Sequence, residues 1–159
     1  MIRVREVRKS SSSELKQKGR NCMSRILVVD DDVAICSAIR IVLEQAGHEV
    51  VLATDGRTGV NAVANSTFDI VICDIFMPGM DGIETIHAFH QSNPQMPVIA
   101  MSGFMFRDGQ APAPDYLSLS TKLGAAYSLR KPFRPQELLK AVQECTANAA
   151  RASDLKAAG

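Results

Sequence analysis

The feature that most constrains this 159-residue chain is a short apolar run that stops abruptly at three aspartates. Ile26 to Val29 is apolar at every position, and Asp30, Asp31 and Asp32 follow it directly. A short strand that is apolar at every position, instead of every second one, is typical of a parallel sheet covered on both faces. The chain is therefore predicted to fold as an α/β protein around such a sheet.

The alternation of apolar strand and amphipathic helix repeats along the chain. Apolar residues spaced three and four apart mark helical segments between the apolar runs. Strands are predicted at 26–29, 49–53, 68–73, 97–101 and 126–129, and helices at about 35–46, 56–65, 83–92, 115–123 and from Pro135 onward. Asp32 is placed to cap the first helix. Five strands alternating with five helices imply right-handed crossovers and helices on both faces of the sheet.

Polar residues follow the predicted strands in a consistent way. Asp30 and Asp31 follow the first strand, Asp74 the third, Ser102 the fourth and Lys131 the fifth. Parallel strands bring their carboxyl ends to one edge of the sheet, so these side chains should converge. Crowded carboxylates repel one another, and an oxygen-ligated cation such as Mg²⁺ relieves that repulsion. A hydroxyl and an ammonium nearby suit phosphoryl oxygens, so the pattern predicts a phosphoryl-transfer site.

Charge is distributed unevenly along the chain. Residues 1–22 hold seven basic and two acidic side chains, with little apolar periodicity, so 1–23 is predicted to be a disordered basic tail. It is either an arm that contacts an acidic partner or a membrane surface, or a stretch upstream of a true start at Met23. The remaining eleven basic and fifteen acidic residues give 23–159 a formal charge of about −4. That charge argues against sequence-independent binding of nucleic acid.

The remaining bulk features indicate a protein of the cytoplasm. The chain has no apolar run of about 18 residues, so no membrane span is expected. The basic N-terminus lacks the apolar stretch of a secretory signal. The four cysteines form no C-x-x-C pair and are expected to be reduced thiols; they are Cys22, Cys36, Cys73 and Cys145.

Four motifs in order give the chain a resemblance to the receiver domain of bacterial two-component response regulators. They are 26–31, then Asp74 with the turn at 77–82, then Ser102, then 131–133. The resemblance covers about 25–147. It implies a flavodoxin-like, doubly wound (βα)5 sandwich whose five-stranded parallel sheet has the order 2-1-3-4-5. The domain is accordingly assigned to 24–147, and 148–159 is expected to be a frayed C-terminal tail.

The resemblance also implies a role for each motif residue. Asp74 would accept the phosphoryl group and ligate Mg²⁺. Asp31 would ligate the metal directly, Asp30 through a water, and Phe76 through its backbone carbonyl.

On the other side of the pocket, Ser102 would hydrogen-bond a phosphoryl oxygen. Lys131 would pair with the phosphoryl charge, and the bond from Lys131 to Pro132 would be cis. These residues would make the chain a catalyst of its own phosphorylation and dephosphorylation only, and otherwise not an enzyme.

The sequence departs from the family at the residue that usually carries the signal onward. Ser128 occupies the strand position where most receivers have Tyr or Phe, while Tyr127 beside it should face the other way. The loop at 102–114 is longer than usual and contains apolar residues at 104–106. One hypothesis is that this loop moves on phosphorylation in place of the missing aromatic ring.

Three functions fit these features. The first is a stand-alone phosphorylatable receiver, served by a sensor histidine kinase or phosphotransfer protein and acting on an unknown target protein. About twelve residues follow 147, so an output domain and direct DNA binding are not expected. The second is a phosphorylation-independent interaction domain, supported by Ser128. The third, a nucleotide- or flavin-binding enzyme, is disfavoured because three aspartates after the first strand would repel a phosphate.

Overall fold

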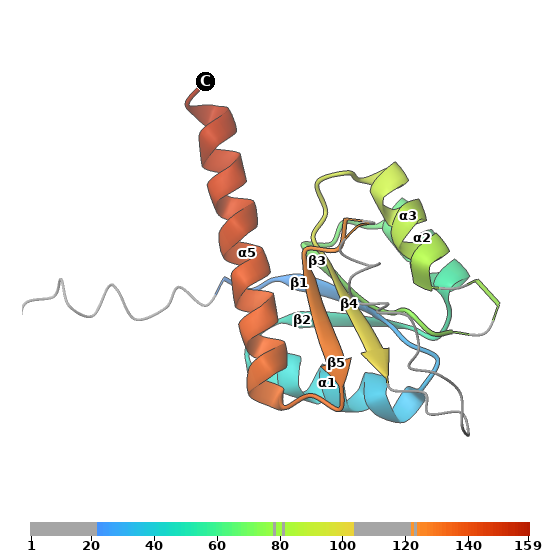
Figure 1. Ribbon diagram of the computed structural model, residues 1–159. Coiled ribbons are helices and arrows are strands. Elements are labelled where there is room, and N and C mark those ends of the chain that lie inside the picture. Colours follow the sequence, from blue (N-terminus) through green and yellow to red (C-terminus); the bar gives the residue numbers. More distant parts are fainter. Residues whose placement is uncertain (1–21, 78, 81, 104–121, 123) are drawn as a thin grey trace, which may run out of the picture.

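A computed structural model describes residues 22–77, 79–80, 82–103, 122 and 124–159 (Figure 1). Its centre is a five-stranded sheet with the order β2-β1-β3-β4-β5, in which every neighbouring pair is parallel. The strands are β1 Arg25–Val29, β2 Glu49–Ala53, β3 Ile70–Asp74, β4 Val98–Gly103 and β5 Tyr127–Lys131. The predicted fold class and strand order are confirmed.

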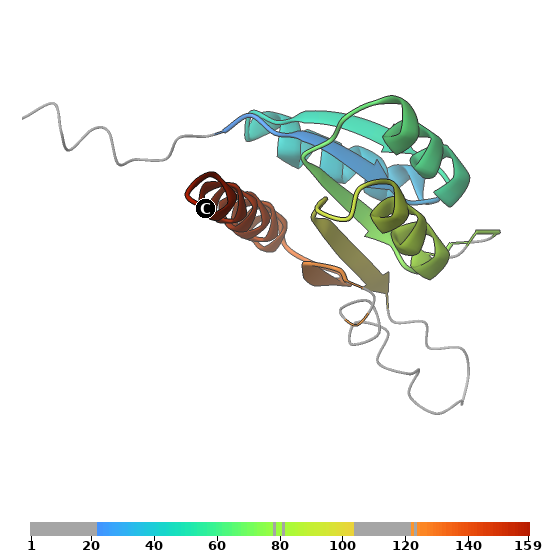
Figure 2. The ribbon, with the colours of Figure 1, turned by 90° about the horizontal axis from the view of Figure 1, so that it is seen from above.

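Helices cover both faces of this sheet (Figures 1 and 2). The described helices are α1 Val33–Gln45, α2 Gly56–Asn65, α3 Gly82–Ser92 and α5 Pro135–Ala157. Helices α1 and α5 contact each other on one face, and α2 and α3 contact each other on the other. The helix predicted at 115–123 lies, apart from residue 122, outside the described residues. No helix in the described part of the chain is long and apolar enough to cross a membrane.

The hydrophobic core has two halves because alternate strand residues face opposite sides. Ile26, Ile72 and Met101 pack with α1 and α5, whereas Leu27 and Cys73 belong to the half beneath α2 and α3. All five side chains are fully shielded from solvent. Shielding of consecutive residues on both faces explains why the strand sequences lack alternation.

Helices α1 and α2 each begin at an aspartate cap. The Asp32 carboxylate accepts hydrogen bonds from the backbone N–H groups of Ala34 and Ile35 at the start of α1. The Asp55 carboxylate accepts from the N–H of Thr58 at the start of α2. Such caps satisfy backbone donors that a helix cannot satisfy itself, and each is typically worth about 1 kcal/mol. The cap predicted at Asp32 is confirmed.

The last helix corrects one expectation. Residues 148–159 were expected to fray, but α5 continues without a break to Ala157. The stretch is rich in alanine, which has the highest helix propensity, and it contains no proline or glycine before Gly159. Local propensity therefore extends the helix well past the layered sandwich, as Figure 1 shows. Residues 147–157 are all exposed.

Candidate phosphoryl-acceptor site

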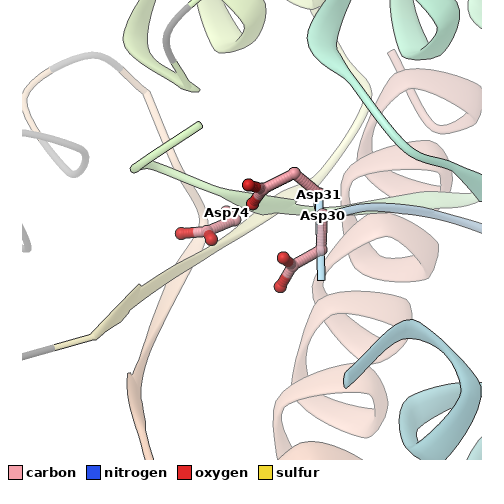
Figure 3. A group of neighbouring side chains, drawn as sticks. All are labelled: Asp30, Asp31 and Asp74. Atoms are coloured by element: carbon pink, nitrogen blue, oxygen red, sulfur yellow. The ribbon is translucent and has the colours of Figure 1, made fainter. Parts of the chain in front are cut away.

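An acidic cluster lies at the carboxyl ends of β1 and β3. Asp30, Asp31 and Asp74 each have a carboxylate oxygen within 4.8 Å of the others. Figure 3 shows the three side chains gathered at this edge of the sheet. Asp30 and Asp74 are buried, with 0% and 5% of their surface exposed, whereas Asp31 is exposed. Strands β1 and β3 are direct neighbours, so their ends bring residues 30, 31 and 74 together. This is where the strand order reverses, which is the usual place for a site in such sheets.

Hydrogen bonds fix both the backbone and the carboxylate of Asp30. Its backbone N–H donates to the carbonyl of Ala53 at 3.1 Å. Its carboxylate accepts one hydrogen bond from the backbone N–H of Asp32 at 2.9 Å and another from the Lys131 ammonium at 2.6 Å. Such partners offset the solvation that a carboxylate loses on burial. Asp30 is therefore fixed in orientation before any ligand arrives.

Asp74 is held by two different groups. Oδ1 accepts from the backbone N–H of Phe76 at 3.0 Å, and Oδ2 accepts from Lys131 Nζ at 3.0 Å. Burial raises the pKa of Asp74 above its ordinary value, although the Phe76 hydrogen bond and the Lys131 charge act in the opposite direction. The carboxylate is thus poorly solvated and presented to the pocket by defined donors.

Lys131 bridges the two buried acids from the end of β5. Burial disfavours its ammonium, but the hydrogen bond to Asp30 and the charge of Asp74 outweigh that effect and raise the pKa of Lys131. Its side chain is only 16% exposed. The peptide bond from Lys131 to Pro132 is cis, as the resemblance implied.

The loop after Asp74 is tied closely to the start of α3. The N–H of Gly82 donates to the carbonyl of Ile75 at 2.9 Å. A Cβ at Gly82 would stand 2.2 Å from the Asp74 carbonyl and 2.3 Å from Ile75 Cα, so only glycine fits there. This close approach sets the position of the acceptor relative to α3.

The other predicted residues lie along the same edge of the sheet. Ser102 is 6% exposed and directly follows Met101, the register partner of Asp74. Phe76 is half-buried and packs against the core beneath α2 and α3, with its backbone beside Asp74. The structure thus gathers every predicted site residue at one edge; the role of each remains a prediction.

The strand position of the missing aromatic is as predicted. Tyr127 packs against the core half formed with α1 and α5, and the pleat directs Ser128 to the opposite face. Ser128 pairs in register with Ala100 on β4. The loop at 102–114, which is hypothesised to move on phosphorylation, lies outside the described residues apart from Ser102 and Gly103.

Sequence reasoning missed two groups that support the site. The sequence predicts Asp32 only as a helix cap, yet its backbone N–H also donates to the Asp30 carboxylate. The sequence predicts Cys36 only as a packed thiol, yet its Sγ donates to the Asp30 carbonyl at 3.3 Å. Burial and the nearby Asp30 charge raise the pKa of Cys36 to about 11, so it stays a protonated donor. Its place six residues after Asp30, one helical turn into α1, was the available signal.

The cluster suits a hard divalent cation. Three carboxylates and one ammonium leave the site with two net negative charges when all are ionised. Oxygen ligands from Asp30, Asp31 and Asp74 are the kind that Mg²⁺ and similar ions prefer. The pocket could therefore bind a metal ion, and Lys131 beside it could interact with an anionic group delivered to Asp74.

Comparison with known proteins agrees with this geometry. A family model described as the response regulator receiver domain matches residues 26–143. The transcriptional regulatory protein ZraR of Klebsiella oxytoca is 36% identical over 123 residues, covering 77% of this chain and 26% of that protein. The regulatory protein VanRB of Enterococcus faecalis is 34% identical over 124 residues, covering 75% of this chain and 50% of that protein. The chain therefore spans a quarter to a half of the length of these relatives.

Solved structures show the same fold. A receiver domain protein from Clostridium thermocellum aligns with a TM-score of 0.74 and 29% identity, covering 82% of this chain and 99% of that one. A CheY-like receiver domain protein from Methanospirillum hungatei aligns with a TM-score of 0.73 and 30% identity, covering 82% and 98%. Since the family match and the acidic edge of the sheet agree, the chain belongs to the response regulator receiver domain family of two-component signalling proteins.

Proposed function

We propose that this receiver accepts a phosphoryl group on Asp74 with the help of Mg²⁺. The observation that carries the proposal is that the carboxylates of Asp30, Asp31 and Asp74 lie within 4.8 Å of one another. Lys131 also contacts Asp74. The donor would be a phosphohistidine of a sensor kinase or phosphotransfer protein in the cytoplasm. The chain would catalyse its own phosphorylation and dephosphorylation and no other reaction.

The residues of the site have distinct parts in this transfer. One carboxylate oxygen of Asp74 forms a bond to phosphorus while the bond from phosphorus to the donor's nitrogen breaks, which gives an acyl phosphate. Lys131 can bind the transferred phosphoryl group, because its ammonium already lies 3.0 Å from Asp74 Oδ2. Asp30 and Asp31 would hold the metal, with the Phe76 carbonyl as a further ligand and Ser102 donating to a phosphoryl oxygen. Bound Mg²⁺ supplies the charge that neutralises and orients the phosphoryl oxygens.

Phosphorylation by a small donor tests this proposal directly. The full chain is incubated with acetyl phosphate and MgCl₂ and resolved on a gel that retards phosphoproteins. We expect a retarded species that disappears with EDTA and in Asp74→Asn. Asp154→Asn, which removes an exposed carboxylate from α5, serves as the matched control and should be retarded like the wild type. An unphosphorylated wild type, or an equally phosphorylated Asp74→Asn, would contradict the proposal and favour a phosphorylation-independent interaction domain.

The output of the phosphorylated protein is proposed to be contact with another protein. Residues 23–159, which include every described helix and strand, carry a formal charge of about −4. That charge supports the prediction that this chain does not itself bind DNA. ZraR is named a transcriptional regulatory protein, so a gel-shift assay with genomic DNA fragments is the measurement that checks this.

A further inference from the structure

Asp32 joins the start of α1 to the acidic cluster. Its carboxylate Oδ1 accepts the N–H groups of Ala34 at 2.9 Å and Ile35 at 3.2 Å. Its own backbone N–H donates to Asp30 Oδ1 at 2.9 Å. Residue 32 is therefore bonded in two directions, with its side chain toward the helix and its backbone toward the buried acid.

Cys36 makes a second connection between the same two segments. Its backbone N–H donates to the Asp32 carbonyl at 3.0 Å, and its thiol donates to the Asp30 carbonyl at 3.3 Å. Cys36 is 1% exposed and belongs to the core half beneath α1 and α5. The backbone on both sides of Asp31 is thus attached to the first turn of α1.

These attachments bear on Asp31 in particular. Asp31 is exposed, so surrounding side chains do not enclose it as they enclose Asp30. The direction of its carboxylate therefore depends on the backbone at residues 30 and 32. A ligand set that must meet a small cation with near-ideal geometry loses affinity when that backbone is free to move.

We propose that Asp32 is a positioning residue for the divalent cation. By capping α1 it fixes the backbone of 30–32, so that Asp30 and Asp31 face the metal together with Asp74. The proposal rests on the proposed function, since the cation is part of that function. Groups that orient metal ligands without touching the metal typically change affinity by 10–100-fold, roughly, when they are removed.

A set of substitutions separates the cap from the charge. Asp32→Ala removes both the capping oxygen and the negative charge, whereas Asp32→Ser and Asp32→Asn keep a capping oxygen and remove only the charge. The dissociation constant is measured by titrating the full-length protein with MgCl₂ alone and following backbone amide NMR signals. We expect Asp32→Ala to weaken Mg²⁺ binding by about tenfold. Asp32→Ser and Asp32→Asn should stay within about twofold of wild type, because an exposed charge is well screened.

Asp55→Ala is the matched control for losing a helix cap. Asp55 caps α2 through the Thr58 N–H at 2.7 Å and is not a member of the acidic cluster. Its removal should lower the melting temperature much as Asp32→Ala does. The Mg²⁺ dissociation constant should nevertheless stay within about twofold, again because the lost charge is screened.

A second readout needs no metal. In the metal-free protein, the amide proton of residue 32 should exchange slowly in the wild type and in Asp32→Ser, and faster in Asp32→Ala. This pattern is expected because the N–H is held against Asp30 only while the cap is intact.

Several results would overturn the positioning role. Asp32→Ser and Asp32→Asn binding as weakly as Asp32→Ala would assign the effect to charge. If Asp32→Ala bound Mg²⁺ as tightly as the wild type, the cap would have no effect on the metal. If Asp55→Ala lost as much Mg²⁺ affinity as Asp32→Ala, the loss would come from a general destabilisation of the fold. A wild type that does not bind Mg²⁺ at all would instead overturn the metal step of the proposed function.

Discussion

At the scale of single residues, the site holds more negative charge than Lys131 balances. Asp31 is the exposed member of the cluster, and its neighbours Asp30 and Asp74 are buried carboxylates within 4.8 Å. Such crowding lowers stability in the absence of a cation, a cost that active sites commonly carry. Lys131 compensates part of it by contacting both buried acids.

Asp31→Asn should therefore stabilise the metal-free protein. A like-charge contact at this distance costs about 1 kcal/mol in a water-like dielectric, so we expect a gain of up to about 1 kcal/mol in the free energy of unfolding. Mg²⁺ should stabilise the wild type by mass action but not this variant. Urea unfolding in EDTA and in MgCl₂ measures both effects. Asp154→Asn is the control, and an Asp31→Asn variant that Mg²⁺ stabilises as strongly as wild type would refute the prediction.

His48 gives a prediction about pH. Burial lowers the pKa of His48 below its ordinary value, and its Nδ1 accepts the backbone N–H of Ser24 at 3.3 Å, which requires an unprotonated nitrogen. The unfolded chain therefore takes up this proton at a higher pH than the folded chain. Stability from this residue is complete above about pH 6.5 and is lost as pH falls below that value toward the folded pKa.

The loss between pH 7.5 and pH 5.5 should accordingly be smaller in His48→Gln than in the wild type. Urea unfolding at both pH values gives the comparison. His87→Gln is the control, since His87 lies on the exposed surface of α3 beside Gln91. A His48→Gln variant with the same pH dependence as the wild type would show that the Ser24 contact does not depend on protonation.

At the scale of elements, the contact between the Asp74 loop and α3 leaves no room for a side chain. Gly82→Ala would place its Cβ 2.2 Å from the Asp74 carbonyl, and both contacting groups are backbone. We expect a loss of about 2 kcal/mol or more in the free energy of unfolding, with slower phosphorylation of Asp74. Gly103→Ala is the control, because no atom of the described residues lies within 4 Å of its added Cβ. Equal stability of the two variants would mean that the loop adapts easily.

Most elements could be predicted from the sequence because their signals are local. Apolar runs defined the strands, and aspartate caps defined the starts of α1 and α2. The carboxyl-edge rule brought Asp30, Asp74 and Lys131 together correctly, although they are distant in sequence. The extension of α5 was missed because it has no core contacts to mark it, and alanine propensity alone decides it. The hydrogen bond from the Asp32 N–H to Asp30 could not be predicted, because nearly every residue type has the same backbone donor.

At the scale of the whole molecule, α5 divides into a packed and an exposed part. Leu138, Val142 and Cys145 pack in the core, whereas 147–157 is exposed and projects past the sheet (Figure 1). Burial of apolar side chains, and not the helix itself, supplies most helical stability in proteins. The two parts should therefore contribute very differently to the fold.

Truncation after Ala147 should remove helix without harming the domain. We expect the helical circular dichroism signal to fall, while the free energy of unfolding changes by no more than about 0.5 kcal/mol. Phosphorylation of Asp74 by acetyl phosphate should proceed at the wild-type rate. A further truncation after Ala141, which removes Val142 and Cys145, should unfold the protein in the same assay and serves as the positive control. If the variant that ends at Ala147 did not fold, the domain boundary would lie beyond residue 147.

The Lys131 bridge also ties charge balance in the acidic cluster to the completeness of folding. Lys131 is 101 residues from Asp30 and 57 residues from Asp74 along the chain, and it comes from the last strand of the sheet. Contacts of such long range form only after the intervening chain has closed into place. During synthesis, a chain that has made β1 to β4 holds the acids without their counter-charge. The counter-charge of the two buried acids is thus supplied only after β5 has been made and has paired with β4.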